Sequence, residues 1–126
     1  MLANRDAIVT ISVKSLPAAR AFYEGKLRLE PARIDDATGT ATYRSGNSML
    51  LVYQSEFAGT NKATAATWGL GPDFDASLKA LQDAGVAFEH YDMPGGRREG
   101  DVHRFGDFKA AWFRDPDGNI LHINNE

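Results

Sequence analysis

The three histidines are the side chains of this sequence best suited to acid–base or metal chemistry near neutral pH. A neutral imidazole gains or loses a proton near physiological pH and is also the commonest metal ligand. The sequence has no cysteine, which excludes thiolate nucleophiles, disulfides, iron–sulfur clusters and cysteine-bound zinc. Any catalytic or metal site must therefore use histidine, carboxylate, hydroxyl or amide groups.

Two of the histidines stand near carboxylates, in or just before a glycine-rich stretch from Pro94 to Gly106. This stretch is typical of a solvated flap, mobile enough to close over a pocket. An alternative is a metal site, because carboxylate and imidazole groups together can hold a divalent ion. That alternative set consists of Glu89, His90, Asp101 and His103.

Length and composition indicate one compact domain. The chain has 126 residues, of which 43% are hydrophobic and 25% charged, as in ordinary globular proteins. The net charge is -3 and the basic residues are scattered, so no nucleic-acid partner is expected, and we interpret the pair Arg97-Arg98 as part of a solvated loop. No stretch reaches the roughly 18 apolar residues of a membrane span, and the N-terminus lacks a signal sequence. We expect a soluble cytoplasmic protein with no membrane partner.

The first half of the chain predicts a strand, a helix and three strands. Ala7–Val13 alternates apolar and polar residues, which is the pattern of a strand with its even-numbered positions on one face. Ser15 and Pro17 favour a helix start, and we expect a helix over Ala18–Lys26. Three extended stretches separated by turn residues follow, at Leu29–Asp35, Thr38–Arg44 and Ser48–Gln54.

The same order returns after a connector at Ser55–Ala63. A strand, a helix and a strand are expected at Thr64–Gly71, Asp73–Ala84 and Val86–Tyr91. Two more strands, Lys109–Arg114 and Asn119–Asn124, flank a turn with the sequence Asp-Pro-Asp-Gly. We therefore expect one domain made of two modules, at about residues 1–54 and 64–126, with a linker at 55–63.

Two segments of the chain resemble a known family. They are Ile11-Ser12-Val13 followed by Leu16, Ala19, Phe22-Tyr23 and Leu27, and the run from Ala111 to Asn119 with its Asp-Pro-Asp-Gly turn. Together they resemble the vicinal oxygen chelate superfamily, which contains glyoxalase I, bleomycin resistance proteins and extradiol dioxygenases. The resemblance covers essentially the whole chain. It implies an α+β fold in which two βαβββ modules form curved antiparallel sheets around a concave pocket, and it implies a homodimer.

Metal-using members of that family hold one divalent ion with side chains from the first and last strands of each module. The resemblance places these positions at Ile8, Leu50, Ala66 and His122. Three aliphatic side chains cannot donate to an ion, and one ligand alone holds it too weakly. We therefore expect no metal and no other cofactor, which disfavours glyoxalase or dioxygenase chemistry because both need the ion.

The resemblance also places His122 on the inward side of its strand, near the centre of the pocket. We name it as the candidate catalytic residue, acting as an acid or base, and keep open a core histidine bonded to a backbone carbonyl. The two tryptophans suit a planar ligand, with core packing as the alternative. The predicted ligand-binding set is Thr10, Ser12, Leu50, Gln54, Trp68, Trp112 and His122.

These observations favour a metal-independent protein that binds a small, partly aromatic molecule; antibiotic sequestration is the nearest family role. An alternative is a glyoxalase- or dioxygenase-like enzyme with a shifted metal set or with His122 as acid/base. A third interpretation is a module that serves assembly and has an occluded pocket.

Overall fold

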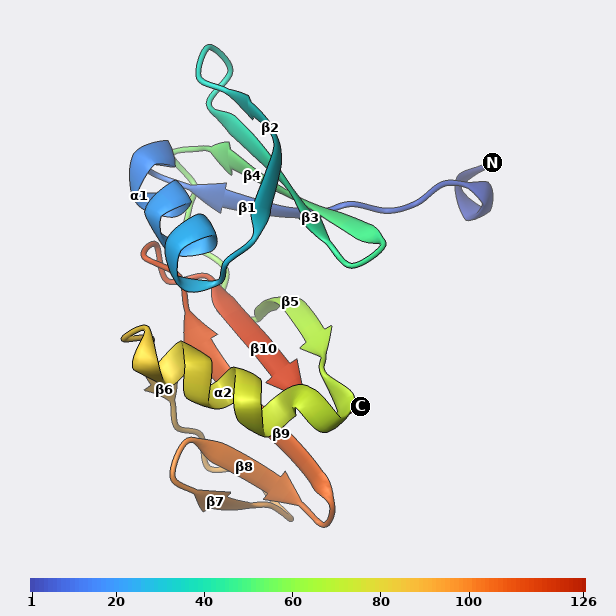
Figure 1. Cartoon of the computed structure of the whole chain (residues 1–126), viewed down its shortest axis with the longest axis vertical. Helices are drawn as coiled ribbons and strands as arrows, with labels where there is room; N and C mark the ends of the chain where they lie inside the picture. The colour runs from blue at the N-terminus through green and yellow to red at the C-terminus, as the bar shows by residue number, and fades with distance from the viewer. The chain divides into compact units, whose positions relative to one another are not determined.

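The computed structural model describes residues 1–126, which divide into two compact units (Figure 1). The first unit contains Met1–Asn61 together with Pro116–Asn119. The second contains Lys62–Asp115 together with Ile120–Glu126. The change from one unit to the other at Asn61 falls inside the expected connector. None of the helices has the length and hydrophobicity that a membrane-spanning helix requires.

The first unit forms a four-stranded sheet in the order β1-β4-β3-β2. All neighbouring strands are antiparallel except β1 and β4, which run parallel because a helical crossover separates β1 from the rest of the sheet. Its elements are η1 (Leu2–Asn4), β1 (Val9–Val13), α1 (Leu16–Arg20), η2 (Ala21–Lys26), β2 (Glu30–Asp35), β3 (Thr40–Ser45) and β4 (Ser48–Gln54).

The first helix begins and ends differently from the expectation. The Ser15 hydroxyl caps it by accepting a hydrogen bond from the Ala18 N–H at 3.3 Å, so the helix begins at Leu16 rather than Ala18. From Ala21 to Lys26 it widens into a π-helix, η2. The consecutive residues Phe22 and Tyr23 are both buried in this segment, which broadens the face that packs on the sheet.

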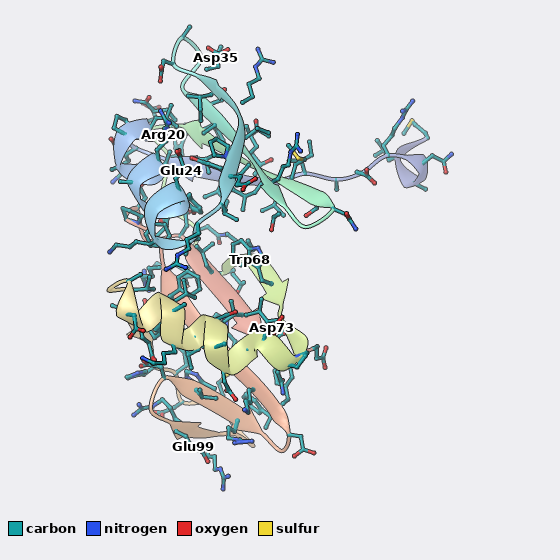
Figure 2. The ribbon with its side chains drawn as sticks, in the orientation of Figure 1. Arg20, Glu24, Asp35, Trp68, Asp73 and Glu99 are labelled. Atoms are coloured by element: carbon teal, nitrogen blue, oxygen red, sulfur yellow. The ribbon has the colours of Figure 1, made fainter.

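Helix α1 and η2 cover one face of the first sheet. Tyr43 of β3 stacks on Tyr23 with ring centroids 6.2 Å apart, and its hydroxyl donates to Glu24 at 2.8 Å. Glu24 also accepts a hydrogen bond from Arg20 at 2.7 Å, and Figure 2 shows these two side chains together on the helix. Because side chains alternate along each strand, Ile11 and the other buried aliphatic residues of β1, β3 and β4 also lie on this helix-covered face.

The second unit repeats the arrangement. Its sheet order β5-β10-β9, with β6 also paired to β9, matches β1-β4-β3-β2 element by element, and β5 and β10 form the parallel pair. The predicted two-module fold is confirmed. The sheets were expected to be antiparallel, whereas each of them also contains one parallel pair of strands. Its elements are β5 (Thr64–Gly69), η3 (Gly71–Asp73), α2 (Phe74–Asp83), β6 (Phe88–Glu89), β7 (Arg97–Glu99), β8 (Val102–Phe105), β9 (Phe108–Arg114) and β10 (Ile120–Asn124).

The glycine-rich stretch expected to be a flap is instead a hairpin, β7–β8, that extends the second sheet. Its tip is the two-residue loop Gly100-Asp101, and a second such loop, Gly106-Asp107, leads into β9. Both glycines have positive φ, 61° and 62°, which a type II′ hairpin turn needs at its first position. Through β8, the hairpin pairs with the N-terminal half of β9. The expected strand at Val86–Tyr91 is shortened to the two residues of β6.

Helix α2 covers one face of the second sheet. Lys109 of β9 forms an ion pair with Asp75 of α2 at 2.9 Å and lies over the Phe74 ring, which places Lys109 on the helix side. Alternation along β9 puts Phe113 on the same side and Trp112 on the opposite side. We call the side without the helix the open face.

The turn between β9 and β10 belongs by its contacts to the first unit. Asp117 accepts a hydrogen bond from the Lys14 N–H at 3.1 Å, and the Asn119 amide donates to the Ser12 carbonyl at 2.8 Å. A Cβ added to Gly59 would lie 2.1 Å from the Asp117 carbonyl oxygen. The Asp-Pro-Asp-Gly motif is therefore the turn that the sequence predicted, and it also fastens the end of β1.

Candidate functional site

Four rings gather on the open face of the second unit. His122 of β10 and Trp112 of β9 are cross-strand partners, and their rings stack with centroids 4.5 Å apart and an angle of 22°. His103 of β8 meets Trp112 edge-on at 5.0 Å. Tyr91, which follows β6, contacts both Trp112 at 5.7 Å and His103 at 5.9 Å. This ring cluster consists of Tyr91, His103, Trp112 and His122.

The two histidines of the ring cluster are held as neutral rings. His122 is 9% exposed, and its Nδ1 lies 3.1 Å from the Ala111 carbonyl, so Nδ1 carries the proton and Nε2 accepts from the Asn124 amide at 3.3 Å. His103 accepts a hydrogen bond from the Tyr91 N–H on Nε2 at 2.9 Å. Burial lowers the pKa of both imidazoles, because the charged form loses its hydration.

These bonds limit the acid–base chemistry available to His122. A general base needs a ring nitrogen free to take a proton from a substrate. Both nitrogens of His122 already have partners, one of them a backbone carbonyl. The structure therefore shows the core arrangement that was the alternative to catalysis for this residue, while the Trp112 ring beside it is half-buried and reaches the surface.

A pocket of about 340 Å³ opens beside the ring cluster, within the size range of small-molecule sites. Two cluster members, Tyr91 and His103, form part of its wall. The turn at Met93–Gly96 covers another part, and a Cβ on Gly96 would lie only 2.6 Å from the Phe105 ring, so only glycine allows the turn to rest on that ring. The remaining wall residues include Asp92, Arg97 and Arg98.

Strand registers divide the predicted ligand-binding residues between faces. Thr10 and Ser12 lie on the side of the first sheet away from α1, as expected. Leu50 and Gln54 lie instead on the helix side, since they pair with Val9 and Val13, and Leu50 is 2% exposed. In the second unit, His122 and Trp112 share the open face, whereas Trp68 pairs with Ile123 on the α2 side. The expectation of one common face is therefore wrong for Leu50, Gln54 and Trp68.

The positions assigned to metal ligands were misjudged in the same way. Ala66 pairs with Leu121 rather than His122 and points to the α2 side, and Leu50 points to the α1 side. A register error of one residue moves a side chain to the opposite face, which explains both mistakes. Thr67, the partner of His122 on the open face, supplies only a hydroxyl.

The side chains present do not fit the family's metal. In neither unit do three His, Asp or Glu side chains gather in a way that could hold an ion. Within the alternative set of the second unit only two members meet, because His90 pairs with Asp101 at 2.7 Å. Glu89 pairs with Arg114 instead, and His103 bonds to the Tyr91 backbone.

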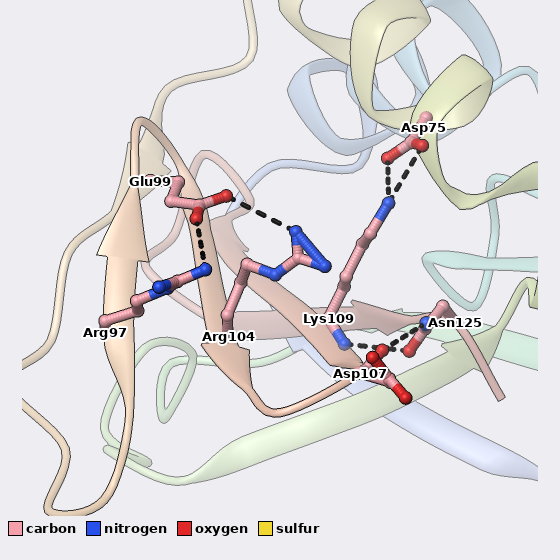
Figure 3. A network of polar contacts seen from close by, with 7 residues as sticks. All are labelled: Asp75, Arg97, Glu99, Arg104, Asp107, Lys109 and Asn125. Carbon is pink, nitrogen blue, oxygen red and sulfur yellow. Dashed lines mark hydrogen bonds and ion pairs between the residues drawn. The ribbon is translucent and has the colours of Figure 1, made fainter.

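The α2 side of the hairpin carries a separate charged network (Figure 3). Glu99 bridges Arg97 at 2.9 Å and Arg104 at 3.4 Å, while Lys109 reaches Asp75. Asn125 accepts from the Lys109 N–H and donates to the Asp107 carbonyl. These contacts hold β7, β8 and the C-terminus against the sheet. The guanidinium of Arg97 is therefore already paired with a carboxylate.

Sequence reasoning missed Tyr91 and Arg98 as site residues. Tyr91 had been placed at the end of a strand, and Arg98 in a solvated loop. The signal that could have found them is the pair of two-residue Gly-Asp loops on either side of the run from Val102 to Phe105, because such loops are typical of hairpins. A hairpin reading would have placed Arg98 opposite His103, as the structure does.

The chain belongs to the Glyoxalase/Bleomycin resistance protein/Dioxygenase superfamily, whose family model matches residues 7–123. This match confirms the family that the two sequence segments indicated. Comparison with curated protein sequences gives no match.

Solved structures with the same fold cover nearly the whole chain. An integron cassette protein from the mobile metagenome of the Halifax Harbour sewage outfall has a TM-score of 0.71 at 17% identity, over 98% of this chain and 99% of that chain. The fosfomycin resistance protein FosX from Mesorhizobium loti has 0.69 at 14%, over 100% and 94%. A glyoxalase/bleomycin resistance protein/dioxygenase from Alicyclobacillus acidocaldarius has 0.71 at 20%, over 96% and 90%. Identities this low show a shared fold only.

Proposed function

We propose that the protein binds a small planar molecule on the open face of its second unit without a metal ion. The observation that supports this most is the ring cluster and its adjoining pocket. A half-buried Trp112 stacked on a neutral His122 offers an aromatic surface, and Tyr91 and His103 carry that surface into the pocket wall. A purely structural sheet face has no need of a pocket lined by rings.

The absence of a suitable donor set separates this role from the chemistry of metal-using relatives. Those reactions depend on an ion that polarises or binds the substrate. The aliphatic residues at Ile8, Leu50 and Ala66 cannot replace such ligands. A binding role in which the ligand is held and released therefore suits this chain better than lyase or dioxygenase chemistry. Since FosX is a fosfomycin resistance protein, antibiotic sequestration is one role compatible with the fold.

The two tryptophans allow a direct test. Trp68→Phe leaves only Trp112, on the open face, and Trp112→Phe leaves only Trp68, on the α2 side. Titration with nitrobenzene, a neutral planar quencher, should give saturable quenching in the first variant and only a weak linear decrease in the second. Trp112→Ala should weaken binding by about 1 to 3 kcal/mol through lost apolar contact.

The same titration tests metal independence. Added EDTA should change neither the affinity nor the amplitude, and elemental analysis of the purified protein should find no stoichiometric transition metal. Saturable quenching confined to Trp68, or binding that disappears with EDTA, would contradict the proposal.

We also propose that the protein is a cytoplasmic homodimer. Support comes from strand β1, which is an edge of the first sheet and carries a 38% exposed Val9 next to a 52% exposed Ile8. An exposed strand edge with apolar side chains is a ready template for pairing with another chain. Sedimentation at micromolar concentration should show a dimer, and a monomer alone would argue against it.

A further inference from the structure

The pocket beside the ring cluster has a distinct charge pattern. Its wall contains Arg97 and Arg98 against a single acid, Asp92. Arg97 is already paired with Glu99 at 2.9 Å. Arg98 has no carboxylate within 4 Å; its Nη1 donates to the Gly100 carbonyl at 2.9 Å, which leaves its other N–H groups available.

The position of Arg98 follows from the strand register. It pairs with His103 across β7 and β8, so its side chain leaves the sheet on the open face. The charge of Arg98 also acts on that histidine and adds to the effect of burial in lowering its pKa. The guanidinium is therefore close to the ring cluster rather than on the α2 side, where Arg97 and Arg104 lie.

Two polar atoms beside the pocket, the Tyr91 hydroxyl and His103 Nδ1, are buried and lack a well-formed hydrogen bond. Both are covered by surrounding protein, so neither reaches a ligand in the pocket. The polar group that the wall offers to a ligand is therefore Arg98, and a guanidinium with free N–H groups is matched best by a negative acceptor.

The remaining wall is apolar. Met93, Pro94 and the rings of Phe105 and Tyr91 line the pocket beside Arg98. A cation would meet Arg98 at close range, and a plain hydrocarbon would leave the guanidinium unmatched. From this combination we infer that the pocket binds a planar carboxylate: the anion lies at Arg98, and the aromatic body lies against the rings. The inference rests on the proposed function, because it specifies the ligand of the same face.

A matched pair of probes tests it. Benzoate and benzamide have nearly the same shape, and only benzoate is an anion at neutral pH. Binding to the full-length protein should be saturable for benzoate, with benzamide about tenfold weaker, a difference of about 1.4 kcal/mol. The benzoate affinity should fall as salt is added, because the guanidinium is exposed.

Variants identify the residue responsible. Arg98→Gln should remove the preference for benzoate and bring the two affinities to within about twofold. Arg44→Gln, an exposed arginine on β3 of the first unit, is the matched control and should keep the preference.

The outcomes separate the two proposals. Equal affinities for both probes in the wild type, or a preference that survives Arg98→Gln, would overturn the carboxylate inference. The proposed function would still stand in that case if Trp112→Ala weakened both probes. The carboxylate inference would also be overturned if benzoate showed no saturable binding up to about 10 mM, because such an affinity is below that of even a weak specific site. The quenching titration with nitrobenzene tests the proposed function independently.

Discussion

The two units share one topology and differ in chemistry. Each has a sheet in which the first and last strands run parallel, with a helix over one face. Yet all three histidines and both tryptophans belong to the second unit, and so does the inserted hairpin. The first unit has its polar network on the helix side of its sheet, where Glu24 accepts hydrogen bonds from Arg20 and Tyr43. The second places its rings on the side that no helix covers.

This difference shows that the fold and the candidate site depend on different residues. Alternating apolar residues and a helix stripe are needed in both copies, because each copy must bury one sheet face. The open face is not constrained in this way, so one copy can carry Thr10 and Ser12 there while the other carries Trp112 and His122. The hairpin adds a pocket to the second copy only.

The largest expected effect tests whether the two cores are equivalent. Tyr43 and Phe113 are both almost fully buried on helix-covered faces of corresponding strands. Tyr43→Ala and Phe113→Ala should each lower the free energy of unfolding by about 3–5 kcal/mol, measured with urea. Thr42→Ala, next to Tyr43 but on the other face, should cost less than about 0.5 kcal/mol. A small effect for either aromatic alone would mean that one unit does not depend on its core.

The next effect concerns pH and should come from the second unit alone. Burial lowers the pKa of His103 and His122, so the unfolded chain takes up protons below about pH 6.5 before the folded protein does. The free energy of unfolding should therefore fall as the pH drops below 6.5, by at most about 1.4 kcal/mol per pH unit for each histidine. His103→Gln and His122→Gln should each make urea midpoints less sensitive to pH between about 6.5 and 5. An unchanged dependence in both variants would show that neither ring is kept neutral.

A smaller pair of effects with opposite signs sharpens the comparison of backbones. Gly106 has a φ of 62° in the turn before β9, so Gly106→Ala should destabilise the protein by about 1 kcal/mol. Gly25 lies in the helical segment of the first unit, where a Cβ would meet nothing within 4 Å. Gly25→Ala should stabilise by about 0.5–1 kcal/mol. The midpoints of thermal unfolding should move in opposite directions, and a shift of the same sign in both variants would contradict the turn geometry.

Much of the fold could be predicted from the sequence because its signals are local. The alternation of apolar and polar residues predicted β1, and the Asp-Pro-Asp-Gly motif predicted the turn between β9 and β10. The parallel pairing of β1 with β4 could not be obtained this way, because it joins strands far apart in the chain. The hairpin was missed because glycine content was interpreted as mobility, although Gly100-Asp101 is also a two-residue hairpin loop.

The candidate site was predicted less well because faces depend on register. The inward side of His122 was predicted, and both tryptophans were assigned to the pocket. Only Trp112 shares the open face with His122, since the pairing of Trp68 with Ile123 is set by an irregularity between Ile120 and Leu121 in the contact with β5. No single-sequence pattern reports such a bulge. The ligand-binding role of the whole set remains a prediction.

One measurement tests the central claim most directly: NMR mapping of nitrobenzene binding in the presence of EDTA. The account predicts that backbone and side-chain signals of Tyr91, His103, Trp112 and His122 shift together and saturate with one dissociation constant, while Thr10 and Ser12 of the first unit do not move. Shifts centred on the first unit, or shifts that appear only after a divalent metal is added, would contradict metal-independent binding on the open face of the second unit.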